Sequence, residues 1–243
     1  MAFRKLLSAL GVGAPEVETE PDRTRYLPGE EVTGTITLRG GAADAEIERL
    51  TAELVVRFES HLTESTYLHP VARRELTGPF TLRAGEVRTE RLSLPLPLAV
   101  PLTHAGGRPL KGAYCAIRTE LAVDKAVDRG DLDEMEVHAL PSQAAVLRAF
   151  EALGFRFDEA EVKPGIALGS RQDVDWWQEI ELSAPPGYGL DTVELLLAVL
   201  PDEIDVRPGT TVAPLTLRHE ETADPAALTA RLEAHLRSVF PPR

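Results

Sequence analysis

The side chains best able to do chemistry in this chain are spread thinly along the sequence. Cys115 is the only cysteine, which excludes an internal disulfide and a metal site built from cysteines. The histidines also occur singly, without the H-x-H or H-E-x-x-H spacing that lets neighbouring imidazoles share a zinc ion. They are His61, His69, His104, His138, His219 and His235. We therefore expect surface or structural roles for the histidines, no metal site and no cofactor.

Motifs of catalytic nucleophiles and phosphate-binding loops are absent from the sequence. The chain contains no G-x-S-x-G, P-loop, G-x-G-x-x-G or C-x-x-C pattern. Cys115 lies within an alternating apolar segment and has no histidine close to it in the sequence, so we expect a small core side chain rather than a nucleophile. The sequence thus predicts no catalytic residue. An enzyme of unrecognised type is retained only as the third interpretation.

An acidic stretch around residues 128–134 is the next candidate for ligand binding. Asp128, Asp131, Asp133 and Glu134 are hard-cation ligands by type, but their spacing lacks the alternation and the glycine of a calcium loop. The tripeptide Arg-Gly-Asp at 129–131 is expected to be a solvated turn. Neither pattern predicts a site.

The only two tryptophans, Trp176 and Trp177, are adjacent. Neighbouring residues on a strand face opposite sides, so one is expected in the core and the other at the surface or between lobes. The alternative is a ligand-stacking platform in a carbohydrate- or small-ligand-binding module. An exposed tryptophan lining a groove would favour that alternative.

Composition limits the partners of the chain. Its 243 residues carry a net charge of −13 with a pI near 5.0, which argues against nucleic-acid binding. A hydrophobic content of 43% is enough for one large or two small cores. The single cysteine favours a reducing cytoplasm.

The N-terminal segment MAFRKLLSALGVGAPE has helical periodicity. Phe3, Leu6, Leu7 and Leu10 share one face, and Gly11 then ends the helix. A packed amphipathic helix is the preferred interpretation, followed by membrane-surface attachment and then by secretion. No segment reaches the length of about 20 apolar residues that a spanning helix needs.

Most of the remaining chain alternates with the period of two typical of half-buried strands. The alternation is clear in 49–59 and 112–126 and returns after residue 176. Two helices interrupt it: one at 142–153 capped by Ser142 and ended by Gly154, and one from Pro225 capped by Asp224. We therefore predict a mainly β protein with two antiparallel sandwich lobes, at 1–140 and 141–243, the helix at 142–153 linking them.

The stretch YLPGEEVTGTITLRGG, residues 26–41, is expected to determine shape rather than chemistry. Pro28 and Gly29 suit a turn in which the glycine takes a positive φ. Gly34 interrupts the apolar side of the following strand, which predicts a bulge or close packing against the opposite sheet.

This stretch also carries a family resemblance. Together with KGAYCAIRTELAV and LGFRFDEAEV, RYLPGEEVTGTITLRGG resembles the bacterial sporulation-control proteins, over roughly residues 1–160 and more loosely beyond Trp176. The resemblance implies an arrestin-like fold of two tandem β-sandwich lobes, with Tyr26, Pro28, Gly29 and Gly34 as structural motif residues. It implies a regulatory or scaffolding role inside the cell and transfers no catalytic residue.

We therefore expect a non-catalytic regulatory protein that binds other proteins, with a homodimer as a further candidate. The interaction residues predicted are the N-terminal apolar face and the strand at 33–38, with Thr33, Thr35 and Thr37. That strand lacks proline, so any exposed part of it is expected to offer an edge for strand addition, whereas prolines protect the segment 95–101. The groove between the lobes is the second predicted docking place, and an acidic surface would favour basic partners.

Overall fold

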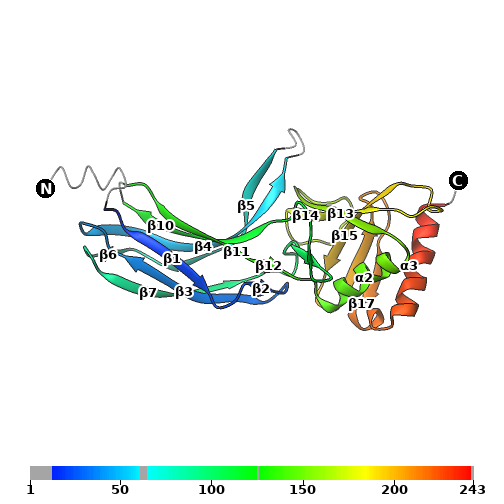
Figure 1. Ribbon diagram of the computed structural model, residues 1–243, viewed down its shortest axis with the longest axis horizontal. Coiled ribbons are helices and arrows are strands. Elements are labelled where there is room, and N and C mark those ends of the chain that lie inside the picture. Colours follow the sequence, from blue (N-terminus) through cyan, green and yellow to red (C-terminus); the bar gives the residue numbers. More distant parts are fainter. Residues whose placement is uncertain (1–12, 61–64, 125, 242–243) are drawn as a thin grey trace. The chain divides into compact units, whose positions relative to one another are not determined.

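The structure is a computed structural model that describes residues 13–60, 65–124 and 126–241. Its elements follow the order β1 (Glu16–Pro21), β2 (Arg25–Tyr26), β3 (Glu31–Arg39), β4 (Ala45–Glu59), β5 (Thr66–Thr77), β6 (Phe80–Leu82), β7 (Val87–Pro95), β8 (His104–Ala105), β9 (Arg108–Pro109), β10 (Cys115–Val123), β11 (Arg129–Glu134), β12 (Glu136–Val137), α2 (Pro141–Ala152), β13 (Arg156–Pro164), β14 (Trp176–Ser183), β15 (Thr192–Val199), β16 (Glu203–Pro208), β17 (Leu215–Arg218), the 3-10 helix η1 (His219–Thr222) and α3 (Pro225–Val239). Figure 1 labels these elements. The predicted mainly β character is confirmed.

The chain divides into two compact units. Unit 1 contains the residues up to Val55, Pro70–Pro97 and Cys115–Met135, and unit 2 contains Val56–His69, Leu98–Tyr114 and Glu136–Arg243. The last passage from unit 1 to unit 2 lies close to the predicted boundary after residue 140. The second unit also takes up two earlier segments. The first contains the end of β4 and the start of β5, which contribute residues to both units, and the second contains β8 and β9.

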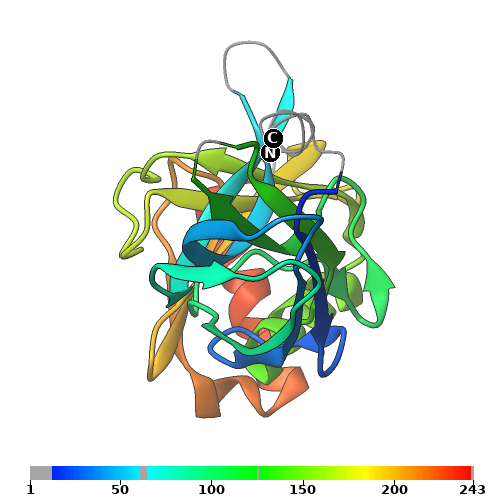
Figure 2. The same cartoon turned by 90° about the vertical axis from the view of Figure 1, so that its left-hand side faces the viewer.

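Unit 1 contains two antiparallel sheets, which Figure 2 shows from their end. One has the order β1-β3-β7, and the other has the order β11-β10-β4-β5, with β6 also paired to β4. Val32, Ile36 and Leu38 are fully buried on one side of β3, as are Leu54 and Ile117 in the other sheet. In β3 the predicted alternation therefore marks the face that lies in the core. The half-buried strand predicted at 49–59 is wrong for residues 50–56 of β4, where Thr51 and Glu53 on the polar face are buried as well.

β3 is the central strand of its sheet. It pairs with β1 from Glu16↔Arg39 to Pro21↔Gly34, and with β7 from Glu31↔Pro95 to Arg39↔Val87. The expectation that 33–38 offers an edge for strand addition is wrong, because its backbone is hydrogen-bonded on both sides. β7 is an edge of this sheet and ends at Pro95, as the prolines there predict.

Two expectations for the 26–41 stretch have different outcomes. Gly29 has φ +82° in a turn closed by the Glu30 N–H, which donates to the Leu27 carbonyl at 3.1 Å, so the predicted turn is confirmed. The predicted bulge at Gly34 is wrong: the β3–β7 register passes through Gly34 without a break, and the β1–β3 register is continuous up to its last pair, Pro21↔Gly34. Gly34 is instead needed because a Cβ there would lie 2.4 Å from the Glu20 carbonyl oxygen of neighbouring β1.

The Arg-Gly-Asp tripeptide lies in β11 and is not a turn. The Asp131 carboxylate accepts the Thr19 backbone N–H at 2.8 Å, and the hydroxyls of Thr19 and Thr119 are hydrogen-bonded to each other. Asp131 therefore joins β11 to β1 of the other sheet. The expectation of a solvated turn is wrong. Five of the six residues of β11 are polar or glycine, so the sequence has no apolar alternation that would indicate a strand.

Unit 2 contains an antiparallel sheet of order β13-β14-β15-β16-β17, each strand pairing with the next in sequence. Helix α2 packs against β16, η1 and α3. The predicted apolar faces are buried: Val146, Leu147 and Phe150 on α2, and Leu228, Leu232 and Leu236 on α3. The helix predicted as a link between lobes thus packs on elements of unit 2.

The helix ends follow local chemistry. The Asp224 carboxylate accepts the N–H groups of Ala226 and Ala227, which confirms it as the cap of α3. Ser142 does not cap α2: with Pro141 at the first helical position the cap moves to Leu140, whose N–H donates to the Gln143 side chain at 2.9 Å. No described helix is long and apolar enough to cross a bilayer.

The predicted face of Phe3, Leu6, Leu7 and Leu10 lies outside the described residues. The packed-helix and membrane-surface interpretations of this segment therefore stay predictions.

Cys115 is 1% exposed on β10, and burial raises the pKa of its thiol. We expect the native protein to resist a thiol-specific reagent at pH 8 and to react with one equivalent once unfolded in guanidinium, because only the thiolate attacks. The absorbance of the released reagent anion measures both states. Fast reaction of the native protein would contradict this burial.

Candidate functional site

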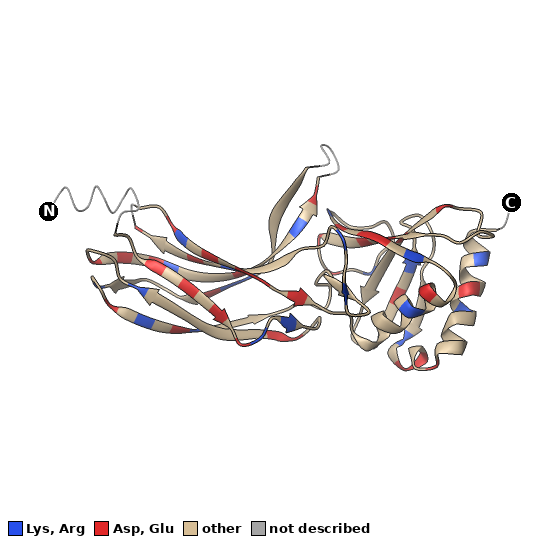
Figure 3. Ribbon diagram, viewed as in Figure 1, with Lys and Arg blue, Asp and Glu red and all other residues tan. Residues whose placement is uncertain are grey.

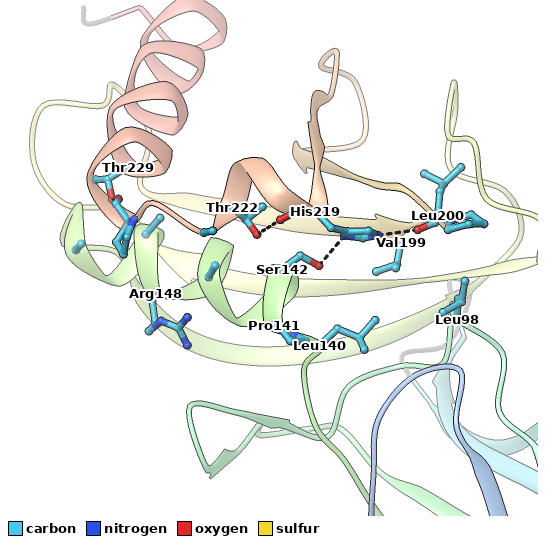
Figure 4. A pocket seen from close by; sticks show the side chains of 16 residues that line it. Leu98, Leu140, Pro141, Ser142, Arg148, Val199, Leu200, His219, Thr222 and Thr229 are labelled. Carbon is cyan, nitrogen blue, oxygen red and sulfur yellow. Dashed lines mark hydrogen bonds between the residues drawn. The ribbon is translucent and has the colours of Figure 1, made fainter.

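An apolar groove on unit 2 has a volume of about 780 Å³. We call it the helix groove. Its lining residues are Leu98, Leu140, Pro141, Ser142, Ala145, Arg148, Ala149, Ala152, Val199, Leu200, Pro201, His219, Thr222, Ala223, Pro225 and Thr229. Figure 4 shows them around α2, η1 and the start of α3. Its volume falls in the range of about 300–1,000 Å³ that is usual for binding sites.

Small side chains on α2 create the space. Ala145, Ala149 and Ala152 recur at i, i+4 and i+7, so they share one side of the helix. The larger side chains of α2, Val146, Leu147 and Phe150, are buried instead. The alanine spacing is visible in the sequence, but the stripe of bulky apolar residues on the same helix is the stronger signal, and it predicts the buried face and not the groove.

His219 forms hydrogen bonds that connect the elements of one wall of the groove. Its Nδ1 lies 3.0 Å from the Ser142 hydroxyl and its Nε2 lies 2.9 Å from the Leu200 carbonyl oxygen (Figure 4). Since a carbonyl only accepts, Nε2 carries the proton and Nδ1 accepts from the serine. The Thr222 hydroxyl donates to the His219 carbonyl at 2.7 Å. These bonds connect η1 to the first turn of α2 and to the end of β15.

The Ser142–His219 distance is also that of a nucleophile and its base. Ser142 is only 4% exposed, however, and its hydroxyl proton is committed to the imidazole in the first turn of a helix. A substrate carbonyl would have little access to this oxygen. The pair therefore acts as a structural fastening of the groove wall.

A second cavity of about 200 Å³ is lined by both tryptophans, together with residues 98–102 and 196–201. Trp176 is buried, and its indole nitrogen has no hydrogen-bond partner among the described residues. Trp177 is half-buried and its indole N–H donates to Glu179 at 2.9 Å. The predicted division into a core and a more exposed tryptophan is confirmed, and both contact the same cavity.

The structural motif residues lie together in unit 1. Tyr26 is buried, burial raises the pKa of its hydroxyl, and the Arg23 guanidinium lies 4.5 Å from its ring centroid. Arg23 in turn pairs with Glu30, just after the Pro28–Gly29 turn. The stretch thus fixes the entry into β3, and no reactive group converges there.

The three predicted interaction threonines, Thr33, Thr35 and Thr37, alternate with the core residues of β3 and are half-buried. The Thr33 hydroxyl donates to Asp22 at 2.6 Å. Their contact with a partner stays a prediction, but it cannot use the backbone of β3.

Two of the histidines are not isolated in space. His104 and His138 stack with ring centroids 4.7 Å apart, and Glu136 lies beside them. The expectation that the histidines stay apart is wrong, because 34 positions of sequence separate two residues that a backbone bridge makes neighbours.

Charge is distributed over both units. Figure 3 shows acidic and basic residues interspersed along the described strands and helices, with acidic ones in excess. The helix groove itself is lined by one charged side chain, Arg148. Apolar contact rather than ion pairing would therefore dominate binding inside it.

Comparison with known proteins gives consistent relationships. A family model described as SpoOM protein matches residues 3–207. The sporulation-control protein spo0M of Bacillus subtilis (strain 168) is 31% identical over 213 residues, which cover 84% of this chain and 78% of that protein. The crystal structure of Spo0M, sporulation control protein, from Bacillus subtilis matches with a TM-score of 0.81 and 26% identity, over 93% of this chain and 99% of that one. The predicted arrestin-like fold and the predicted resemblance are both confirmed.

Proposed function

The chain belongs to the SpoOM protein family, and we propose that it is a regulatory protein of sporulation control that acts without catalysis, by binding other proteins. The names of its relatives describe regulators of sporulation. We propose a cytoplasmic location, in keeping with its single buried cysteine. The observation that carries the binding mechanism is the helix groove.

The groove has the features of a protein-docking site. Its lining is mainly apolar and includes three alanines along one side of α2, which would let another backbone approach closely. An amphipathic helix laid into such a groove anchors through side chains at i, i+3 or i+4, and i+7. We propose a helix of this kind as the occupant.

The partner helix would carry basic residues beside its apolar face. The chain has a net charge of −13, so long-range attraction would speed association with a basic segment and weaken as salt screens it. Inside the groove, contact would be apolar and insensitive to salt. Salt would therefore reduce the association rate more than the dissociation rate.

A bulky side chain in the groove should displace the partner helix. We expect Ala145→Trp to weaken partner binding at least about tenfold, because the indole would occupy space that the partner needs. A photo-crosslinking amino acid at position 145 first captures and identifies the partner in native lysate. Calorimetry with that purified partner then compares the wild type with the variant.

Ala234→Trp provides the matched control, since Ala234 is exposed on α3 and does not line the groove. It should bind like the wild type, and crosslinker at 234 should not capture the same protein. As a cellular readout, the wild type and Ala234→Trp should alter heat-resistant spore counts in a Bacillus subtilis strain lacking its own Spo0M protein, and Ala145→Trp should not. Equal binding by both variants would refute the groove as the docking site.

A small-ligand-binding module is the second candidate function. The buried indole N–H of Trp176 at the smaller cavity favours it, because a ligand acceptor could satisfy that donor. At about 200 Å³ this cavity is below the usual size of ligand sites. Ligand binding that persists in Ala145→Trp would distinguish this function from groove docking.

A further inference from the structure

Three side chains with metal-binding atoms converge in unit 2. His104 lies in β8, Glu136 in β12, and His138 directly follows β12. Their candidate ligand atoms all lie within 4.8 Å of one another, and His138 Nε2 is 2.7 Å from a Glu136 carboxylate oxygen. An isolated β-bridge pairs the backbones of His104 and His138, so their imidazoles start from neighbouring positions.

The donor set has a definite chemical preference. Two imidazoles and one carboxylate match the protein ligands of many zinc sites, whereas calcium and magnesium prefer sets made only of oxygen. Nitrogen donors also favour the later divalent transition metals over manganese and iron. The cluster is accessible from solvent as well, since all three residues are only half-buried.

A second layer of contacts already orients one ligand. The Thr103 hydroxyl lies 2.9 Å from His104 Nδ1 and accepts the Val137 N–H at 2.8 Å. Thr103 is buried and its own N–H donates to the Val137 carbonyl, so this hydroxyl is firmly placed. With Nδ1 occupied by Thr103, Nε2 of His104 would be the metal ligand, an arrangement that is usual in zinc proteins.

Only small side-chain movements would be needed to close the set. Bonds of about 2.0–2.1 Å in a tetrahedral site put ligand atoms about 3.3 Å apart. The farthest pair would therefore approach by at most about 1.5 Å from its separation of up to 4.8 Å, within reach of rotations about side-chain bonds. The imidazole rings are already nearly parallel, with an interplanar angle of 18°.

We propose that His104, Glu136 and His138 bind one divalent transition-metal ion of the zinc type. Three protein ligands leave a coordination position for water or for a donor from a partner. The ion would tie the segment that carries β8 and β9 to residues 136–138, which are far from it in sequence. This site is independent of the helix groove and does not rest on the proposed function.

The test uses the full chain with any affinity tag removed and with metals stripped by a chelator. Calorimetric titration with zinc chloride should give one ion per chain. Cobalt(II) should give visible absorption bands of a low-coordinate site, and zinc should abolish them by displacement. Calcium chloride should give no binding, and saturating zinc should raise the melting temperature.

Conservative variants identify the ligands. His104→Gln, Glu136→Gln and His138→Gln should each weaken zinc binding at least about tenfold and lose the zinc-dependent rise in melting temperature. His69→Gln, on β5, should bind like the wild type. Melting temperatures without zinc show that each variant is folded; Glu136→Gln, which preserves shape, covers the case in which a histidine variant does not fold. No zinc binding by the wild type, equal affinity in the ligand variants, or calcium binding as tight as zinc would each overturn the proposal.

Discussion

A Gly34→Ala variant is expected to be less stable than the wild type by about 3 kcal/mol, although it adds a single methyl group. Gly34 lies between Pro21 of β1 and Leu92 of β7, in a strand that is paired on both sides. The new Cβ would lie 2.4 Å from the Glu20 carbonyl oxygen and 2.8 Å from the Pro21 Cα. Both are backbone atoms, so no side-chain rotation relieves the overlap. β1 must move away, with loss of pairing.

Guanidinium unfolding followed by circular dichroism measures the effect as a lower midpoint. Gly78→Ala is the matched control, because a Cβ at Gly78 would meet nothing within 4 Å. We expect that variant to remain within about 0.5 kcal/mol of the wild type. Equal midpoints for the two variants would show that β1 does not constrain position 34.

Lys163→Met is expected to cost about 2–3 kcal/mol at neutral pH, because it removes the cation from a cluster of partly buried carboxylates. The Lys163 ammonium lies 2.8 Å from Glu59, 2.6 Å from Glu161 and 3.8 Å from Glu179. Its side chain is 18% exposed. Burial by itself would lower the pKa of this ammonium, but hydrogen bonds to Glu161 and Glu59 outweigh it and raise that pKa.

The carboxylates that would remain repel one another. Glu161 and Glu179 are directly opposite on β13 and β14, an unfavourable like-charge pair on adjacent strands. A hydrogen bond shared with Glu59, and then burial, already raise the pKa of Glu161, while Lys163 lowers it. Without Lys163 this pKa should rise further.

The loss of stability should therefore depend on pH. A glutamate titrates near pH 4.3 in an unfolded chain. A carboxyl whose folded pKa is higher binds its proton more readily when folded, so stability increases as pH falls through that pKa. We expect the difference between Lys163→Met and the wild type to be largest at pH 7 and to shrink between about pH 6 and 4.

Unfolding curves over this pH range test the prediction. Lys111→Met is the control, since Lys111 also pairs with a glutamate, Glu159 at 2.9 Å, but its side chain is 71% exposed. Solvent screens exposed ion pairs, so this variant should stay close to the wild type at every pH. A deficit in Lys163→Met that is constant with pH would mean that lost packing, and not charge, is responsible.

The sequence was sufficient to predict features that depend on neighbouring residues alone, such as strand faces, helix starts and turns. The two-residue alternation of β3 identified its buried face, since successive side chains on a strand point to opposite faces whatever pairs with it. In β4 the alternation distinguished the apolar face, but residues 50–56 are buried on both faces. Asp224 before Pro225 identified the start of α3, and Gly29 identified the turn before β3. Family resemblance supplied the arrestin-like fold.

Which strands pair with one another could not be predicted from the pattern of neighbouring residues. The sequence of β3 would be the same whether the strand is central or at an edge of the sheet. Alternation reports which face of a strand is buried, and it does not report whether the backbone groups along its two edges are paired. The presence of β1 and β7 on both sides removed the predicted docking edge. The same reasoning failed at Gly34, where the close neighbour is the adjacent strand and not the opposite sheet.

The candidate sites were decided by tertiary structure. His104 meets Glu136 and His138, and Lys163 meets Glu59, across long stretches of intervening chain. Motif spacing detects only ligands carried by one local element, so histidines that occur singly in the sequence gave no signal. The helix groove likewise requires α2, η1 and α3 to be packed together before its alanines enclose any space. Sequence periodicity thus determined the elements and their buried faces, whereas the choice of neighbours, on which every site here depends, is made by long-range packing.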